Sequence, residues 1–347
     1  MKKNFKTILA LALCVLMIFG MTACAEEGVS EMQETASVSV AASNHVAKNP
    51  FKENVKIAYV PNRASDSVGS AWGTGIENYL SQFDTVSFQI FDGEGSADTQ
   101  IGIFADLKEQ KYDAVIVQLV DSSAENVAIQ DLIDAGIPVL SLNISPTIAH
   151  AAAISLSSYD AGIKQAELAC EMAGYKGNVV IIGFPPEVAK LMGDNHIQAW
   201  YDVIEKYPDM QVLEEQAGDW TTEGGNEIMR DYLTKYDNID IVMGGTDAMA
   251  EGCAMAIQAA GREGIQLWGS DGESKALEYI EQGLMTGTIY TDFIEMGKFA
   301  SQLALYAIES DVDLNLQSLN ADGTPKKYNF PSQIVTADNV GSITNRW

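Results

Sequence analysis

The 347-residue sequence is poor in cysteine, histidine and positive charge. It has four cysteines, three histidines, and 21 lysines and arginines against 48 aspartates and glutamates, for a formal net charge of −27. A chain this acidic is poorly suited to nucleic acid or an acidic lipid surface, because both are themselves negatively charged. The charge does not identify a ligand, since a local site can oppose the field of the whole molecule.

The motifs of metal sites and of common enzymes are also missing. Neither CxxC nor HExxH occurs, and so few histidines argue against a structural metal. The sequence lacks a GxSxG elbow, a P-loop and a recognisable Cys–His pair, so we expect neither an enzyme nor a bound cofactor. The stretches "DGEGSAD" (92–98) and "NADGTPKKY" (320–328) lack the alternating oxygen ligands of a calcium-binding loop.

Two of the four cysteines lie in apolar segments with helical spacing. Cys170 occurs in "AELACEMAG" and Cys253 in "AEGCAMAIQ". We interpret both as buried free thiols rather than as a disulfide or a reactive site.

The N-terminal segment has the pattern of a signal peptide. Three lysines within the first six residues precede an apolar run over 8–20. That run is shorter than the roughly 20 residues that a membrane-spanning helix needs. We therefore expect residues 1–23 to be removed and the mature chain to work outside the cytoplasm.

The end of this segment, "MTAC" (21–24), resembles the bacterial lipobox, with Met21 where that pattern more often has Leu. The resemblance implies cleavage before Cys24 and acylation of Cys24, which would anchor the protein to the outer face of the cell membrane. Ordinary secretory cleavage at an A-x-A-like site is the alternative. Residues 24–53, rich in Ala, Ser, Glu and Val without a helical period, are interpreted as a flexible tether.

From residue 54 onward, short β-branched apolar runs alternate with amphipathic segments, and the whole pattern occurs twice. The expected strands are 55–60, 86–91, 112–117 and 137–142, then 178–184, 210–215, 239–245 and 265–271. The expected helices are 70–83, 98–110 and 123–135, then 194–206, 222–235 and 247–260. Such alternation predicts βαβ units, and hence two α/β lobes whose parallel sheets are covered by helices on both faces.

Three stretches carry a resemblance to a known family. They are "ENVAIQDLIDAGIPVLSLN" (125–143), "GGTDAMAEGCAMAIQAAG" (244–261) and "WGSDGESKALEYIEQGLMTGTIYTD" (268–292). Over about 54–340 the chain resembles the sugar-binding proteins of ABC importers, of the ribose- and galactose-binding type. The resemblance implies the periplasmic binding protein type I fold, with two Rossmann-like lobes joined by three crossover segments. We expect one lobe to comprise 54–156 and 292–320, and the other 157–291 and 321–347.

The resemblance also implies a function. It predicts a monomeric extracytoplasmic protein that captures a sugar or related polyol between its lobes by hinge closure and delivers it to an ABC permease. A receptor that presents a bound signal molecule to a chemotaxis or sensor-kinase partner is the alternative. Lactose-repressor-type regulators share the fold but carry a DNA-binding headpiece, whereas this chain has a lipobox.

Ligands of open α/β sheets bind beyond the carboxyl ends of the strands, and the candidate site residues lie there. The resemblance implies ligand-binding roles for Asp66, Trp72, Asn143, His196, Trp220, Thr246, Asp271 and Thr291. Gln118 and Arg63 are further candidates because each closely follows an expected strand. His196 stands where the family usually has an arginine, while Trp220 and Asp271 match its usual residues.

The chemistry of these side chains suits a sugar. Trp220 can cover the apolar C–H face of the ring, and the carboxylate of Asp271 can accept hydrogen bonds from hydroxyl groups. Each has a structural alternative: Trp220 could anchor its turn in the core, and Asp271 could cap the next helix. His196 could be a solvated surface residue, and Trp72 shares helical spacing with Ile76 and Tyr79, as a core residue would.

Overall fold

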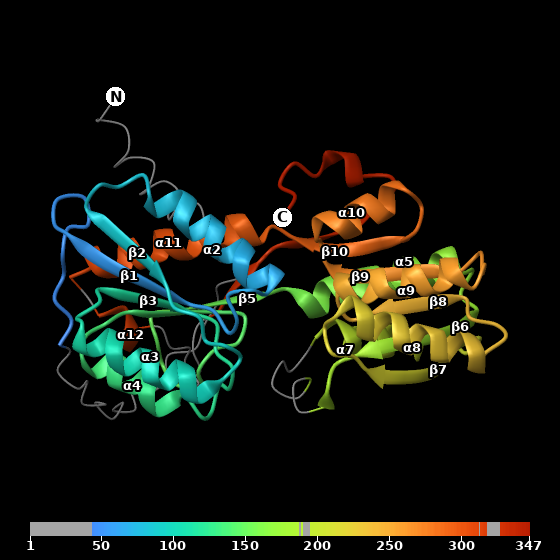
Figure 1. Ribbon diagram of the computed structural model, residues 1–347, viewed down its shortest axis with the longest axis horizontal. Helices are drawn as coiled ribbons and strands as arrows, with labels where there is room; N and C mark the ends of the chain where they lie inside the picture. The colour runs from blue at the N-terminus through green and yellow to red at the C-terminus, as the bar shows by residue number, and fades with distance from the viewer. Residues whose placement is uncertain (1–43, 187–188, 190–194, 312, 318–326) are drawn as a thin grey trace, which may run out of the picture. The chain divides into compact units, whose positions relative to one another are not determined.

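The computed structural model describes residues 44–186, 189, 195–311, 313–317 and 327–347 (Figure 1). The expected signal peptide, Cys24 and most of the expected tether lie outside these residues. Among the residues that are described, no helix is both long and apolar enough to cross a membrane.

The last part of the expected tether differs from the prediction. Residues 44–53 are held against the first lobe by hydrogen bonds. Asn44 Nδ2 donates to the carbonyl of Asp134 (2.7 Å), and the backbone N–H of Lys48 donates to the carbonyl of Ile308 (2.9 Å). Lys48 also forms an ion pair with Asp113 (2.5 Å). These residues therefore belong to the folded domain.

The first lobe contains a six-stranded parallel sheet in the order β11-β5-β4-β3-β1-β2. Its strands are β1 (Val55–Val60), β2 (Val86–Ile90), β3 (Ala114–Val117), β4 (Val139–Leu142), β5 (Ala152–Leu156) and β11 (Lys327–Phe330). Its helices are α2 (Ser67–Leu80), α3 (Ala97–Glu109), α4 (Asn126–Asp134), α11 (Phe293–Glu309) and α12 (Leu314–Gln317). Strands β3 and β4 are buried throughout because helices cover both faces of the sheet.

The two faces of this sheet have separate cores. Ile57 and Tyr59 of β1 face α2 and α11, while Ala58 and Val60 face α3 and α4. Side chains alternate between the faces of a strand, so a strand covered on both sides is apolar at every position.

The second lobe repeats this design with the sheet order β12-β10-β9-β8-β6-β7. Its strands are β6 (Gly177–Gly183), β7 (Met210–Ala217), β8 (Ile241–Gly244), β9 (Gln266–Asp271), β10 (Gly287–Thr291) and β12 (Ser332–Thr336), which is antiparallel to β10. Its helices are α5 (Ser158–Met172), α7 (His196–Ile204), α8 (Thr222–Lys235), α9 (Asp247–Ala259), α10 (Ser274–Glu281) and the 3₁₀ turn η2 (Val340–Ser342).

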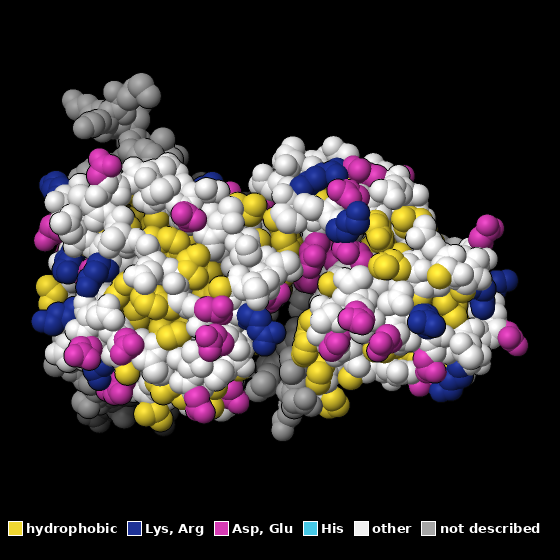
Figure 2. All heavy atoms as spheres, viewed as in Figure 1, with side chains coloured by type: hydrophobic (Ala, Val, Ile, Leu, Met, Phe, Trp, Pro, Cys, Tyr) yellow, Lys and Arg dark blue, Asp and Glu magenta, His cyan; other side chains and the backbone are white. Residues whose placement is uncertain are grey.

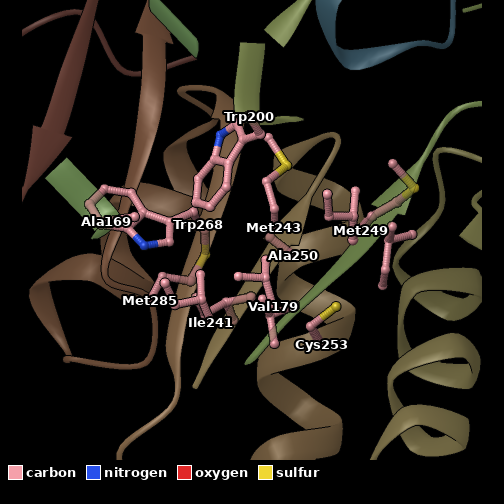
Figure 3. Close-up of a cluster of buried hydrophobic side chains, with 14 of the residues drawn as sticks. Ala169, Val179, Trp200, Ile241, Met243, Met249, Ala250, Cys253, Trp268 and Met285 are labelled. Carbon is pink, nitrogen blue, oxygen red and sulfur yellow. The ribbon is translucent and has the colours of Figure 1, made fainter. Parts of the chain in front are cut away.

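The core of the second lobe is rich in tryptophan and sulfur. Figure 3 shows Trp200 and Trp268 together with Met243, Met285 and Cys253, all at most 3% exposed. Cys253 and Cys170 are both buried and free, which confirms the prediction from their apolar surroundings. Acidic side chains are scattered over the visible surface, in keeping with the net charge (Figure 2).

The chain passes between the two sheets three times. It leaves β5 for α5 at Ser157, β10 for α11 at Asp292, and β11 for β12 at Pro331. The predicted fold class, two parallel-sheet α/β lobes joined by three crossover segments, is confirmed. One detail differs from the expected boundary: residues 327–330 were placed in the second lobe, but they pair with β5 of the first sheet.

Candidate ligand-binding site

The carboxyl ends of the parallel strands gather a distinct set of side chains in the second lobe. Phe184 follows β6, Trp220 follows β7, Thr246 follows β8, and Asp271 and Thr291 end β9 and β10. Since the carboxyl ends of parallel strands lie at one edge of a sheet, these residues share that edge.

Trp220 and Phe184 form an aromatic pair. Their rings are stacked, with centroids 6.1 Å apart and planes inclined by 13°. Phe184 is 6% exposed and Trp220 is 42% exposed, so the indole is not a core residue. The pair provides an apolar surface of the kind on which the C–H face of a sugar ring packs. Phe184 is not among the predicted site residues, although its place at the end of the expected strand 178–184 was a usable signal.

The backbone at Trp220 is strained. Its φ of 63° lies in the left-handed region, which non-glycine residues seldom adopt. The flanking turn holds it there, because the carboxylate of Asp219 accepts hydrogen bonds from both the backbone N–H and the hydroxyl of Thr221. Such strain is often found at binding sites.

His196 is buried beside this aromatic pair. It is 4% exposed and meets the ring of Phe184 edge-on at 5.5 Å, so the alternative of a solvated surface histidine is wrong. Its Nε2 lies 2.8 Å from the carbonyl oxygen of Gly245, which only accepts, so Nε2 carries the proton. Burial lowers the pKa of His196 to about 4, so the ring is neutral at pH 7. Its Nδ1 is left as a buried acceptor without a partner among the described residues.

At the end of β9, the backbone N–H groups bond to Asp247 and not to Asp271. The fully buried Asp247 accepts hydrogen bonds from the backbone N–H groups of Gly272 (2.7 Å) and Glu273 (2.8 Å) and from the hydroxyl of Thr288 (2.6 Å). Asp247 therefore satisfies the donors that Asp271 would have capped. The half-buried carboxylate of Asp271 receives no hydrogen bond from the described part of the chain.

No cation among the described residues compensates the charge of Asp271. Its pKa is raised well above the ordinary value, first by burial and then by the carboxylates of Asp247, Glu273 and Asp66. Its φ of 119° turns the backbone sharply at the strand end. Asp271 is thus an acceptor, held in an unusual conformation, to which none of the described residues donates a hydrogen bond.

The first lobe contributes polar groups at its own strand ends. Asp66 immediately precedes α2, but its side chain does not cap that helix. The hydroxyl of the next residue, Ser67, donates to the carboxylate of Glu273 (2.9 Å), so the start of α2 lies beside the start of α10. Neither Ser67 nor Glu273 was predicted from the sequence.

Gln118 and Asn143 follow β3 and β4. Gln118 is 7% exposed, and its side-chain oxygen lies 3.4 Å from the backbone N–H of Asn62. Asn143 is half-buried with a φ of 61°, and its backbone N–H donates to Ile154. Arg63 is exposed in the loop after β1.

Three predicted residues have evident structural roles. Trp72 is fully buried in the core and meets Phe293 edge-on at 5.3 Å, which favours the core-packing alternative. The hydroxyl of Thr246 caps α9 by accepting from the backbone N–H of Met249 (3.3 Å). Thr291 is 2% exposed and shares a hydrogen bond with Ser332 (2.7 Å). Within the described residues, no cluster of His, Cys, Asp or Glu side chains is arranged to hold a metal ion.

The chain is similar to known proteins over most of its length. A model of the periplasmic binding protein domain matches residues 57–311. A putative rhizopine-binding protein of Rhizobium meliloti is 26% identical over 291 residues, covering 81% of this chain and 90% of that protein. A D-apiose import binding protein of Paraburkholderia graminis is 24% identical over 233 residues, covering 66% of this chain and 71% of that protein.

Solved structures share the fold. An ABC transporter solute-binding protein of Actinobacillus succinogenes with bound D-allose has a TM-score of 0.73 at 24% identity, covering 84% of this chain and 100% of that chain. A Caulobacter myo-inositol-binding protein has a TM-score of 0.73 at 19% identity, covering 84% of this chain and 97% of that chain.

Proposed function

Because the chain belongs to the periplasmic binding protein family, we propose that it captures a sugar or a related polyol and delivers it to an ABC importer. Members of this family bind solutes outside the cytoplasm and are not enzymes. The names of similar proteins refer to D-apiose, ribose and xylitol, and similar folds hold D-allose or myo-inositol. These compounds share a ring or chain that is rich in hydroxyl groups, and the proposed ligand has the same chemistry.

The observation that carries this proposal is the pairing of an aromatic platform with an unused acceptor at one sheet edge. The exposed indole of Trp220, backed by Phe184, covers the apolar face of a ring. The carboxylate of Asp271 accepts from hydroxyl groups on the rim of the ring, and hydrogen bonds to charged groups contribute about 1.5–3 kcal/mol each. Gln118 and Asn143 supply side-chain amides from the first lobe.

Two further parts of the proposal concern anchoring and movement. Acylation of Cys24 would hold the protein at the outer face of the cell membrane, with residues 25–43 as the spacer. A ligand that contacts both lobes would favour a closed conformation, because it makes more contacts there than in an open one. The importer could then distinguish loaded from empty protein by its shape.

A thermal-shift screen of sugars, polyols and nucleosides tests the function. A ligand at 100 times its dissociation constant stabilises the folded state by about 2.7 kcal/mol, which is readily measured. We expect at least one sugar or polyol to raise the melting temperature of the wild type, and to raise it less in Trp220→Ala. Stabilisation by nucleosides alone would contradict the proposal.

A further inference from the structure

The strand ends of the second lobe offer acceptors without matching donors. The carboxylate of Asp271 receives no hydrogen bond from the described residues, because the neighbouring backbone N–H groups bond to Asp247. The Nδ1 atom of His196 is a second unused acceptor, in a side chain that is 4% exposed. An acceptor that is partly withdrawn from water without a donor is costly, so a ligand that supplies donors to Asp271 gains in affinity.

The two side chains are connected to neighbouring strand ends. His196 bonds through Nε2 to Gly245, which follows β8, and Asp247, two residues further on, bonds to the residue after Asp271 on β9. Strands β8 and β9 are adjacent in the sheet. Both acceptors therefore belong to the same end of this sheet, but only Asp271 is open to a ligand, because Nδ1 of His196 is a buried atom.

Within the described part of the chain, the charged groups around Asp271 are carboxylates. The carboxylates of Asp247, Glu273 and Asp66 all act to raise its pKa. None of the ion pairs found among the described residues involves any of these four side chains. Burial raises the pKa of Asp66, and the guanidinium of Arg63 offsets only part of that rise.

The aromatic pair also favours a positively charged ligand. An exposed indole face attracts a cation, and tryptophan is the best aromatic side chain for this interaction. Trp220 presents such a face at the same sheet edge as Asp271.

We infer that the ligand is a sugar or polyol that carries a protonated amino group, with its ammonium beside the carboxylate of Asp271. The ammonium offers up to three donors and a positive charge, whereas a hydroxyl group offers one donor and no charge. This inference rests on the proposed function and specifies the ligand class of the same site. Asp271 is then the residue that selects the amine.

Calorimetric titration of matched ligand pairs tests this inference. The pairs are D-glucose with D-glucosamine, D-galactose with D-galactosamine, and myo-inositol with its monoamino derivative. N-acetyl-D-glucosamine is the control that keeps the nitrogen but loses the charge. For at least one pair we expect the amine to bind about 10-fold or more tightly than its neutral partner, since tenfold corresponds to one charge-assisted hydrogen bond.

Asp271→Asn provides the matching variant. It should weaken binding of the amine at least about 10-fold more than binding of the neutral partner, which loses a hydrogen bond to a charged acceptor but no ion pair. The exposed Asp106, in α3, provides the control, because Asp106→Asn makes the same chemical change without a proposed contact. Should Asp271→Asn fail to fold, the salt dependence of wild-type binding replaces it, since added NaCl should weaken binding of the amine only.

The outcomes separate the inference from the proposed function. Neutral sugars or polyols that bind as tightly as their amines would overturn the inference and leave the function standing. The inference would also be overturned if Asp271→Asn weakened binding of the amine and of its neutral partner equally. Stabilisation of the protein by calcium or magnesium alone would overturn it as well. If no sugar, polyol or amine binds at millimolar concentration, both proposals are wrong.

Discussion

The indole Nε1 of Trp347 donates a hydrogen bond to the backbone carbonyl of Thr291, 3.2 Å away. Thr291 is the last residue before the chain crosses from the second sheet to the first at Asp292. The ring of Trp347 also packs against the buried cores of both lobes, with the ring of Phe293 at 4.9 Å. One side chain thus braces a crossover segment and contributes to two cores.

We expect Trp347→Ala to lower the free energy of unfolding by roughly 1–3 kcal/mol, less than for a fully buried tryptophan because Trp347 is only partly buried. Trp347→Phe, which keeps an aromatic ring but loses the donor, should retain more than half of this stability. Urea denaturation measures both variants. A Trp347→Ala protein as stable as the wild type would show that this contact contributes little.

Ligand binding should make the protein more compact. Residues from both lobes are proposed to contact the ligand, and lobes joined by short crossovers rotate with little repacking. Small-angle scattering should therefore give a smaller radius of gyration at saturating ligand, using the panel compound that stabilises the protein most. A non-binding sugar is the control. An unchanged radius with bound ligand would rule out closure from an open form.

Trp220→Ala should weaken ligand binding by roughly 1–3 kcal/mol while the protein stays folded, since an aromatic contact and its buried area are lost. Tyr175→Ala is a close control. Tyr175 is 44% exposed, has a φ of 59° and lies against Tyr207, so its truncation makes a comparable change away from the strand ends. Calorimetry and thermal unfolding measure the two effects. Unchanged affinity with a large loss of stability would assign Trp220 a structural role.

Cys24→Ala should release the protein from the membrane fraction without altering ligand affinity, because the proposed acyl anchor is lost. Cys14→Ala, a change within the apolar run of the expected signal peptide, should leave the protein attached. Cell fractionation followed by immunoblotting distinguishes these outcomes. A Cys24→Ala protein that remains with the membrane would mean that something other than this cysteine holds it there.

The stability of the protein should depend on pH through Glu125. This side chain is fully buried, one of its oxygens has no partner among the described residues, and burial raises its pKa from 4.5 to about 7. The folded state thus keeps a proton that the unfolded state loses between these values. The contribution of Glu125 to the free energy of unfolding is fully present below pH 4.5. It is lost as the pH rises through 7, and the total loss is roughly 2–3 kcal/mol.

Glu125→Gln cannot lose that proton, so its stability relative to the wild type should rise by this amount between pH 4.5 and 8. Chemical denaturation at several pH values gives the difference directly. Glu109→Gln, at an exposed position of α3, should follow the wild type at every pH. A constant difference between Glu125→Gln and the wild type would show that Glu125 is ionised throughout.

Much of the fold could be predicted from the sequence, because a strand buried on both faces is a short, uninterrupted apolar run. The run 55–60 is β1, and the amphipathic segment 222–235 is α8, both with the predicted bounds. The edge strand β11 could not be found this way. Its residues, "KYNF", are mostly exposed, and what places them is backbone pairing with β5, more than 170 residues earlier.

The order of the elements also determined which residues reach the strand ends, and Trp220 and Asp271 lie where that rule predicts. Only tertiary structure decided what each residue does there. Helical spacing could not tell whether Trp72 faces a ligand or the core, because Phe293, which covers it, comes from a distant helix. Similarly, either Asp247 or Asp271 could have satisfied the backbone after β9. Asp247 does so because the packing of α9 on β9 brings its carboxylate to Gly272 and Glu273, and no described residue donates to the carboxylate of Asp271.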